Sequence, residues 1–272
     1  MKRHFTAFLL LAALLLTGCA ARQPASEPEP TQPPAETAAP EPSAVPTPTP
    51  EPSPAPAAAR IVCIDPGHQR NGSAAPEPIG PGASETKARV TGGTQGRFTG
   101  VPEYALNLAV ALLLRDELTA RGYTVVMTRE GNDVDLSNAE RAAIARDAGA
   151  DVFVRIHANG SDDPSQTGAM TICMTPQNPY NAALYPESRR LADCVLDAMT
   201  AATGCRRESV WETDTMSGIN WAEMPVTIVE MGYMTNEAED RLMATDDYRA
   251  KLAQGIADGI DAWFLQRESE GA

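Results

Sequence analysis

The sequence predicts an α/β fold with a single twisted, mostly parallel sheet flanked by helices on both faces. From residue 60 onward, short apolar runs of strand length alternate with longer segments of helical periodicity. That alternation is typical of parallel strands joined by helical crossovers. The runs are also almost wholly apolar, as is expected of strands covered on both faces.

The element boundaries follow from local signals. The first helix has Leu106 and Leu113 on one face and Gly122 as its stop. Ser137 and Glu140 fit a capping box that opens the second helix. The predicted strands are 61–64, 123–128, 151–156, 169–174 and 226–229. The predicted helices are 103–121, 137–148, 186–203 and a C-terminal helical segment ending near 266, while 66–101 is expected to be a long loop.

The first nineteen residues predict an export signal. Lys2 and Arg3 precede a short apolar run, Phe8 to Leu16, which is too short to span a membrane. The run ends in Leu16-Thr17-Gly18-Cys19, which resembles a bacterial lipobox, in which the cysteine is lipidated and becomes the mature N-terminus. The alternative is an ordinary cleaved signal in which this cysteine falls by chance.

Residues 20–59 predict a linker between the signal and a catalytic domain at 60–272. Of the 23 prolines in the chain, 13 lie between Ala20 and Arg60, in a stretch without aromatic residues that has nothing to build a core from. A proline-rich chain favours an extended conformation of about 3.1 Å per residue, so the linker reaches on the order of 100 Å. Such a tether suits a target above a membrane surface.

The formal net charge is -14 and the sequence pI is about 4.6. This balance argues against nucleic acid or an anionic membrane surface as the main partner.

The remaining cysteines do not predict a metal site. Cys63 and Cys173 lie in apolar runs and are expected to be small buried hydrophobic side chains. Cys194 and Cys205 are too far apart on one continuous helix to form a disulfide, and could pair only if the helix ended between them, near Gly204. None of the spacings resembles a cysteine zinc site.

Both histidines of the mature chain follow predicted strands. His4 leaves with the signal, His68 comes after the first strand, and His157 comes after the strand 151–156. In open parallel sheets the binding crevice lies at the carboxyl ends of the strands, so the two imidazoles are expected to face one ion. The alternative is a pair of unrelated loop histidines.

Two glutamates occupy similar places. Glu103 opens the first predicted helix, and Glu230 follows the apolar strand 226–229. A carboxylate at the end of a buried strand is costly unless it is paired or has a function. Two histidines and one glutamate make a catalytic zinc set that leaves a position for water. A second, unligated glutamate is suited to accept a proton from that water.

Four separated motifs carry a family resemblance. They are Ile64-Asp65-Pro66-Gly67-His68, Glu103-Tyr104-Ala105-Leu106-Asn107-Leu108, Ile156-His157-Ala158-Asn159 and Pro225-Val226-Thr227-Ile228-Val229-Glu230-Met231-Gly232-Tyr233-Met234-Thr235-Asn236. With them, the domain from about 60 to 266 resembles the zinc-dependent N-acetylmuramoyl-L-alanine amidases, which are bacterial cell-wall hydrolases. The resemblance implies that His68, Glu103 and His157 bind Zn²⁺ and that Glu230 is the catalytic carboxylate. It also implies a peptidoglycan substrate and a twisted α/β sheet.

The chain departs from that family in two places. Gln69-Arg70 stands where the family usually has glycine, and Arg155 stands where a small serine is common. Neither change removes an implied ligand, but both are expected to alter the surroundings of the site. The segment 71–100 is expected either to form one wall of the cleft or to be a passive insertion.

The sequence therefore predicts a lipid-anchored, extracytoplasmic zinc hydrolase of the amide between N-acetylmuramic acid and L-alanine. One alternative is another zinc hydrolase of the wall, such as a peptidase or a deacetylase. Another is a non-catalytic wall-binding module, although this chain retains all four implied site residues.

Overall fold

The computed structural model describes residues 60–271, all of which belong to one domain. The predicted export signal, Cys19 and the predicted linker lie outside the described residues.

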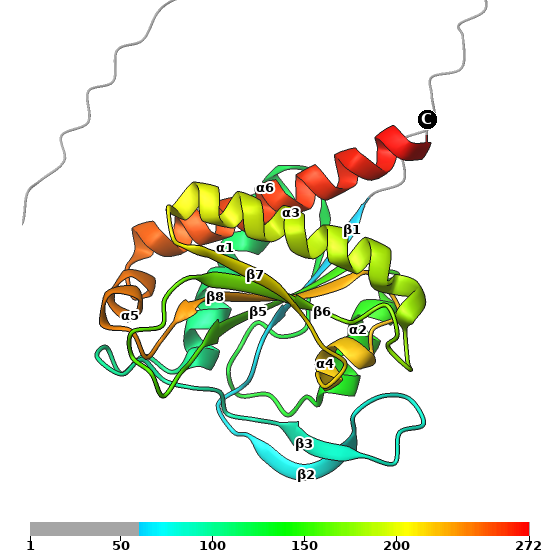
Figure 1. Ribbon diagram of the computed structural model, residues 1–272, viewed down its shortest axis with the longest axis horizontal. Coiled ribbons are helices and arrows are strands. Elements are labelled where there is room, and N and C mark those ends of the chain that lie inside the picture. Colours follow the sequence, from blue (N-terminus) through cyan, green and yellow to red (C-terminus); the bar gives the residue numbers. More distant parts are fainter. Residues whose placement is uncertain (1–59, 272) are drawn as a thin grey trace, which may run out of the picture. The chain divides into compact units, whose positions relative to one another are not determined.

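A six-stranded sheet forms the centre of this domain, with the strand order β4-β1-β5-β8-β6-β7 (Figure 1). The strands are β1 (Ile61–Pro66), β4 (Thr124–Met127), β5 (Val152–Asn159), β6 (Ala169–Cys173), β7 (Arg207–Glu212) and β8 (Val226–Tyr233). The first four in spatial order are parallel, whereas β6 runs antiparallel to β8 and β7 runs parallel to β6. The predicted fold class is confirmed, and only β6 and β7 run against the direction of the other four strands.

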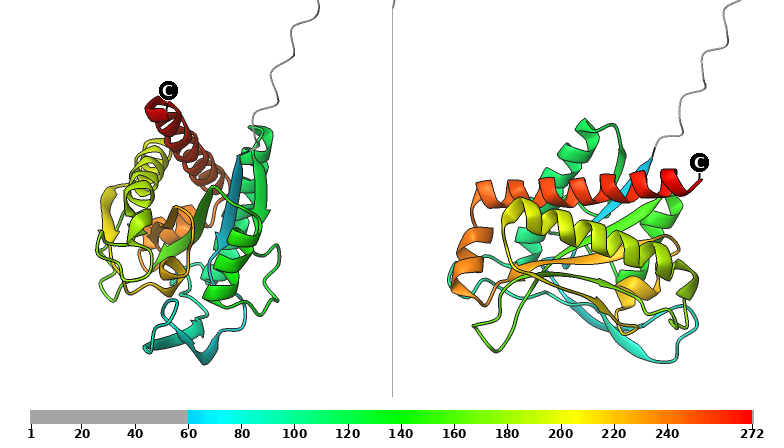
Figure 2. Two further views of the ribbon diagram at one scale, coloured as in Figure 1. Left: turned by 90° about the vertical axis from the view of Figure 1, so that its right-hand side faces the viewer. Right: turned by 45° about the horizontal axis from the view of Figure 1, so that its top comes forward.

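Helices cover both faces of the sheet, but unequally (Figure 2). One face carries three long helices, namely α1 (Glu103–Ala120), α3 (Tyr185–Thr203) and α6 (Asp246–Gly271). The other face carries α2 (Asn138–Asp147) and the single turn α4 (Ser217–Asn220). The short elements η1 (Ala182–Leu184) and α5 (Glu237–Met243) complete the helices. Within 60–271, no helix is both long enough and apolar enough to cross a bilayer.

Strand alternation decides which side chains reach the thinly covered face. In β5, Val152, Val154 and Ile156 pack into the cluster beneath the long helices. Their neighbours Phe153, Arg155 and His157 therefore point to the opposite face, because successive side chains of a strand alternate. Polar side chains near the carboxyl ends of the strands thus gather where α2 and α4 leave room for them.

The segment predicted as a long loop contains a hairpin, so that expectation was wrong. β2 (Ser73–Pro78) pairs antiparallel with β3 (Thr86–Val90). Two side chains at the end of α4 anchor it: Asn220 Nδ2 donates to the carbonyl of Ile79 at 3.0 Å, and Trp221 Nε1 donates to that of Pro78 at 2.9 Å. The sequence did not predict β2 because the strand contains prolines and polar residues. Proline cannot donate a hydrogen bond within a sheet and is therefore found mainly in edge strands.

Other boundaries differ from the prediction in ways that matter for the site. β5 and β8 extend beyond the predicted ends, so His157 and Glu230 lie inside their strands and not after them. β7 was not predicted because half of its residues, Arg207 to Glu212, are charged. Charged residues are tolerated there because β7 is an edge strand of the sheet. The predicted capping box is confirmed: the backbone N–H of Glu140 donates to Ser137 Oγ at 3.1 Å, and that of Ser137 donates to Glu140 Oε2 at 2.7 Å.

The cysteines behave as small side chains in this domain. Cys63 and Cys173 are buried, as predicted. Helix α3 does end before Gly204, which adopts a left-handed φ of 73°. Cys194 and Cys205 are nevertheless free thiols.

Candidate metal centre and active site

His68 is held in an unusual backbone conformation at the end of β1. Its φ is 59°, which makes it the one non-glycine residue with positive φ between residues 60 and 271. Such a conformation costs free energy and persists only when the surroundings fix it. Its Nδ1 lies 2.9 Å from the carbonyl oxygen of Thr91, an acceptor, so Nδ1 carries the proton. The other ring nitrogen, Nε2, faces Glu103 Oε1 at 3.2 Å.

His157 packs against the turn that carries His68. A Cβ added at Gly67 would lie 2.1 Å from Cε1 of His157, so only glycine leaves room for the ring. The Nδ1 atom of His157 lies 3.2 Å from Glu103 Oε1, whereas its Nε2 is buried without a hydrogen-bond partner in the described chain. Burial is the main reason that its pKa falls to about 4, so the ring is neutral at pH 7, as a metal ligand must be.

Glu103 is the first residue of α1, and its carboxylate lies between the two rings. The backbone N–H of Thr94 donates to Oε2 at 2.8 Å, and that of Ala158 donates to Oε1 at 3.2 Å. Burial alone would raise the pKa of this carboxyl, but its interactions with His157 and His68 hold the pKa well below the usual range. Glu103 is therefore an anion fixed in a buried position.

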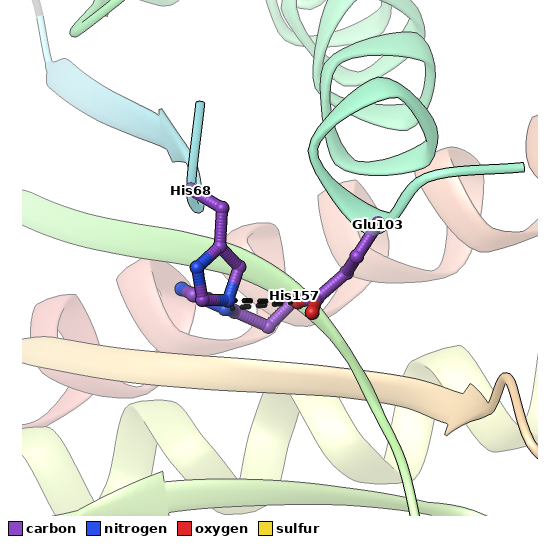
Figure 3. A group of neighbouring side chains, drawn as sticks. All are labelled: His68, Glu103 and His157. Carbon is purple, nitrogen blue, oxygen red and sulfur yellow. Dashed lines mark hydrogen bonds and ion pairs between the residues drawn. The ribbon is translucent and has the colours of Figure 1, made fainter. Parts of the chain in front are cut away.

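The three side chains converge on one point (Figure 3). Glu103 Oε1 lies 3.2 Å from His68 Nε2 and 3.2 Å from His157 Nδ1, and the candidate ligand atoms all lie within 4.8 Å of one another. Zinc ligands at about 2.1 Å in a tetrahedral arrangement are about 3.4 Å apart. The spacing and the donor types fit a metal ion, and the structure thus brings the three predicted ligands together.

Glu230 lies beside this group on β8. It pairs in register with His157 on β5, and both side chains point to the thinly covered face. Its Oε2 is buried without a hydrogen-bond partner within residues 60–271. Burial, and secondarily the negative charge of Glu103, raises the pKa of Glu230 well above its ordinary value. A buried carboxyl group with a raised pKa in a cleft is suited to proton transfer.

A cavity of about 500 Å³ connects these groups. Its lining includes His68, Glu103, His157 and Glu230, together with residues 93–94 and 158–162. The predicted catalytic carboxylate and the predicted ligands thus share one solvent-accessible space.

A second cluster of buried charge supports the turn that carries His68. Asp65, which is fully buried, accepts hydrogen bonds from Arg141 Nη1 at 2.6 Å and Arg155 Nε at 2.8 Å. Arg141 Nη2 also donates to the carbonyl of His68 at 3.1 Å. Arg129 donates to the carbonyls of Pro66 and Gly67, at 2.8 Å from Nε and 3.0 Å from Nη2. Three successive backbone carbonyls are thereby fixed by arginines.

The two departures from the family pattern belong to this support. Gln69 is fully buried and accepts a hydrogen bond from Arg141 Nη2 at 2.8 Å. Arg155 joins Asp65 to Asn138, whose Oδ1 accepts from Nη2 at 2.8 Å. Sequence reasoning placed Arg155 near the site but did not predict its pairing with Asp65. An aspartate within an apolar strand was the available signal, because a buried carboxylate requires cationic partners.

The hairpin forms one wall of a second cavity, of about 380 Å³. Lys87, Ala88 and Val90 of β3 line it, facing residues 215–218 at the start of α4. His68 and His157 line it as well. This favours the first of the two expectations for the segment 71–100, that of a wall.

Comparison with known proteins gives the family. The profile of the family described as N-acetylmuramoyl-L-alanine amidase matches residues 62–262, which is most of the chain. The chain belongs to the N-acetylmuramoyl-L-alanine amidase family. The predicted resemblance is thereby confirmed at the level of the family.

Individual family members support the assignment. The chain is 33% identical to the amidase LytC of Bacillus subtilis over 61% of its own length, but over only 32% of LytC. It is 28% identical to the amidase Rv3717 of Mycobacterium tuberculosis, over 78% of this chain and 89% of Rv3717. The crystal structure of the amidase Ami1 of Mycobacterium abscessus superposes with a TM-score of 0.68 at 31% identity, covering 76% of this chain and 100% of the chain in that crystal structure.

Proposed function

We propose that this protein hydrolyses the amide bond between the lactyl group of N-acetylmuramic acid and L-alanine in peptidoglycan, with Zn²⁺ bound by His68, Glu103 and His157. The single observation that carries the proposal is the convergence of two imidazole nitrogens and one buried carboxylate within 4.8 Å, beside the unpartnered carboxyl of Glu230. Membership of the amidase family supports the choice of substrate.

The donor set favours zinc. Zn²⁺ is commonly bound by neutral imidazole and carboxylate, and catalytic sites use three protein ligands plus one open position. The buried Oε2 of Glu230, which has no partner in the described chain, indicates room for an additional polar occupant beside the three ligands. When bound, zinc would polarise the scissile carbonyl and acidify a water molecule towards neutral pH.

The side chains of the site have separate roles in this proposal. Glu230 accepts the proton of the attacking water and returns it to the leaving amine of L-alanine. Thr91 holds the tautomer of His68 through Nδ1, which keeps Nε2 available to the metal. The backbone N–H groups of Thr94 and Ala158 fix the orientation of Glu103.

Product analysis tests the reaction. The purified protein, with and without restored Zn²⁺, is incubated with purified peptidoglycan, and the new chain ends are identified. We expect new amino groups of L-alanine with intact glycan strands, only when zinc is present. New amines within the peptide would indicate a peptidase, free acetate would indicate a deacetylase, and binding without any cleavage would indicate a wall-binding module. Each of these three outcomes would contradict the proposal.

We further propose that the catalytic domain, residues 60–272, is tethered outside the cytoplasm by a lipid on Cys19 and by the proline-rich linker 20–59. The motif Leu16-Thr17-Gly18-Cys19 and the cell-wall substrates of the family support this location.

Cys19→Ser tests the tether. We expect the substituted protein to leave the membrane fraction or to stay unprocessed, because the substitution removes the thiol that carries the lipid. Fractionation and mass spectrometry of wild type and variant measure this. An unlipidated wild-type protein with a different mature N-terminus would show that the cysteine follows the signal by chance.

A further inference from the structure

The 380 Å³ cavity beneath the hairpin contains two cationic side chains that the proposed reaction does not use. It lies between β3 and the start of α4, and it shares His68 and His157 with the cavity that holds Glu230. Apolar side chains such as Val90, Met216 and Ile228 make up part of its lining. Any substrate bound at the candidate metal centre therefore has a second compartment next to its scissile bond.

Arg155 presents an unused donor at the base of this cavity. The side chain of Arg155 is only 4% exposed, its Nε is bonded to Asp65, and its Nη2 is bonded to Asn138. Nη1 has no acceptor among residues 60–271. A Cβ at Gly218 would lie 1.0 Å from Nη1, so glycine at this position leaves the space that the guanidinium occupies. Because Arg155 lines the cavity, this N–H group is available to an acceptor on a bound ligand.

Lys87 adds a second cation from the opposite wall. It is exposed, and its Nζ donates to the carbonyl of Thr215 at 2.6 Å. It forms no ion pair with any described carboxylate, unlike its neighbour Arg89, which pairs with Asp135 and Glu140. The charge of Lys87 is thus available to an anion in the cavity.

Deeper groups do not cancel this positive charge. Around Asp65, one carboxylate faces Arg141 and Arg155, with Arg129 beside them. Burial and the charge of Arg141 lower the pKa of Arg129 only to about 10, so this guanidinium stays charged at neutral pH. The floor of the cavity therefore carries more positive than negative charge.

Peptidoglycan offers one group that matches these features. The glycan is neutral around the scissile amide and continues in both directions, which suits an open groove. The stem peptide is a short branch, and the residue after L-alanine is a glutamate linked through its side chain, which leaves its α-carboxyl free or amidated. We propose that the cavity binds this free α-carboxylate through Arg155 and Lys87, so that the enzyme prefers stems with an unamidated glutamate. This inference rests on the proposed amidase function.

Two substrates that differ in one group test the proposal. Matched muropeptides carry either free D-isoglutamate or its amide, D-isoglutamine, after L-alanine, and kcat/KM is measured for each with the full chain. Hydrogen bonds to charged groups predict a preference for the carboxylate of roughly tenfold or more. Lys87→Gln should lower this ratio several-fold. Lys251→Gln, which removes the charge of a lysine on α6 that does not line the cavity, should leave the ratio as it is in wild type.

Arg155→Gln should reduce the ratio further, provided that its melting curve shows a folded protein, since Arg155 also pairs with Asp65. Equal cleavage of both substrates by wild type, or a ratio that Lys87→Gln does not change, would overturn the carboxylate site while leaving the amidase function intact.

A binding measurement separates the two proposals. The dipeptides L-alanyl-D-isoglutamate and L-alanyl-D-isoglutamine are titrated into the same proteins by calorimetry. Tighter binding of the carboxylate form, lost in Lys87→Gln, supports the site even if neither muropeptide is cleaved, in which case the proposed reaction alone has failed. Equal binding of the two dipeptides overturns the site.

Discussion

The domain buries charge in two neighbouring clusters that are built differently. Around Asp65, the carboxylate is enclosed by the guanidiniums of Arg141 and Arg155, and Arg141 Nε alone among its buried polar atoms lacks a partner in the described chain. Around Glu103, two histidines share one carboxylate oxygen, while Glu230 beside them has a buried oxygen with no partner within residues 60–271. The first cluster is nearly complete, whereas the second is not.

The difference distinguishes a cluster that stabilises the fold from a cluster that binds a metal or a substrate. Isolated buried charges are costly, so a cluster whose charges find their partners inside the protein serves the fold. A cluster that leaves buried polar groups without partners is stable only with an additional occupant, which is the condition for a metal or a substrate. The pKa values differ accordingly. Burial would raise the pKa of Asp65, but Arg141 and Arg155 hold it well below the usual range, whereas nothing offsets the raised pKa of Glu230.

Removing the candidate ligands should have the largest effect. We expect His68→Ala and His157→Ala each to abolish activity and most zinc binding, because each removes one of three ligand side chains. Elemental analysis of the purified proteins and turnover on peptidoglycan measure the two effects. Stoichiometric zinc in the double variant would place the ion elsewhere and remove the basis of the comparison.

Glu230→Gln should come next, with a loss of activity of about 100- to 10,000-fold, because the amide keeps the volume but cannot accept a proton. Zinc content should stay near normal. The raised pKa means that ionised Glu230 opposes folding above the pKa of the unfolded carboxyl, so the metal-free variant should be at least as stable as wild type at neutral pH.

Turnover, zinc content and melting temperature are measured on this one variant. Activity within threefold of wild type would refute the role of Glu230 as general base. A less stable protein that retains most of its activity would show instead that Glu230 serves the fold.

Asp65→Asn, in contrast to Glu230→Gln, should mainly reduce the stability of the fold. It leaves two buried guanidiniums without their counter-charge, so we expect a loss of about 3–5 kcal/mol in the free energy of unfolding. The lowered pKa in the folded state means that the stabilisation by Asp65 is complete above pH about 4 and is lost as the pH falls below that value. Urea titrations at several pH values measure both effects. A variant as stable as wild type at neutral pH would show that the complete cluster does not support the fold.

Thr128→Val should have the smallest effect and sharpens the comparison. Thr128 Oγ1 donates to Asp65 Oδ1, but both arginines remain as partners in the variant, so we expect a loss of roughly 1–2 kcal/mol. Thermal unfolding measures it, with zinc content as a control. A loss as large as that of Asp65→Asn would mean that the hydroxyl, and not the ion pairs, dominates this cluster.

The fold class could be predicted from the sequence, and the four candidate site residues could be named from it, because both depend on local signals. Apolar runs and the capping box at Ser137 are visible in a few consecutive residues. The hairpin was hidden by the prolines of β2, and the full length of β8 was hidden by the polar Glu230 within it. The pairing of Asp65 with Arg155 joins residues that are 90 positions apart, and only the sheet register brings them together. The hydrophobic periodicity of the sequence does not predict contacts between residues so far apart.

The sequence separation within the candidate metal centre has a consequence for when activity can begin. Its side chains come from the end of β1, from the first residue of α1 and from β5, and His157 lies 54 positions from Glu103. A chain that has formed any one of these elements alone holds at most one ligand. Closing such long loops costs entropy that only the assembled sheet repays. If activity requires all three ligands, as proposed, a nascent or partly folded chain is inert towards the wall. Hydrolytic activity then appears only when folding is complete.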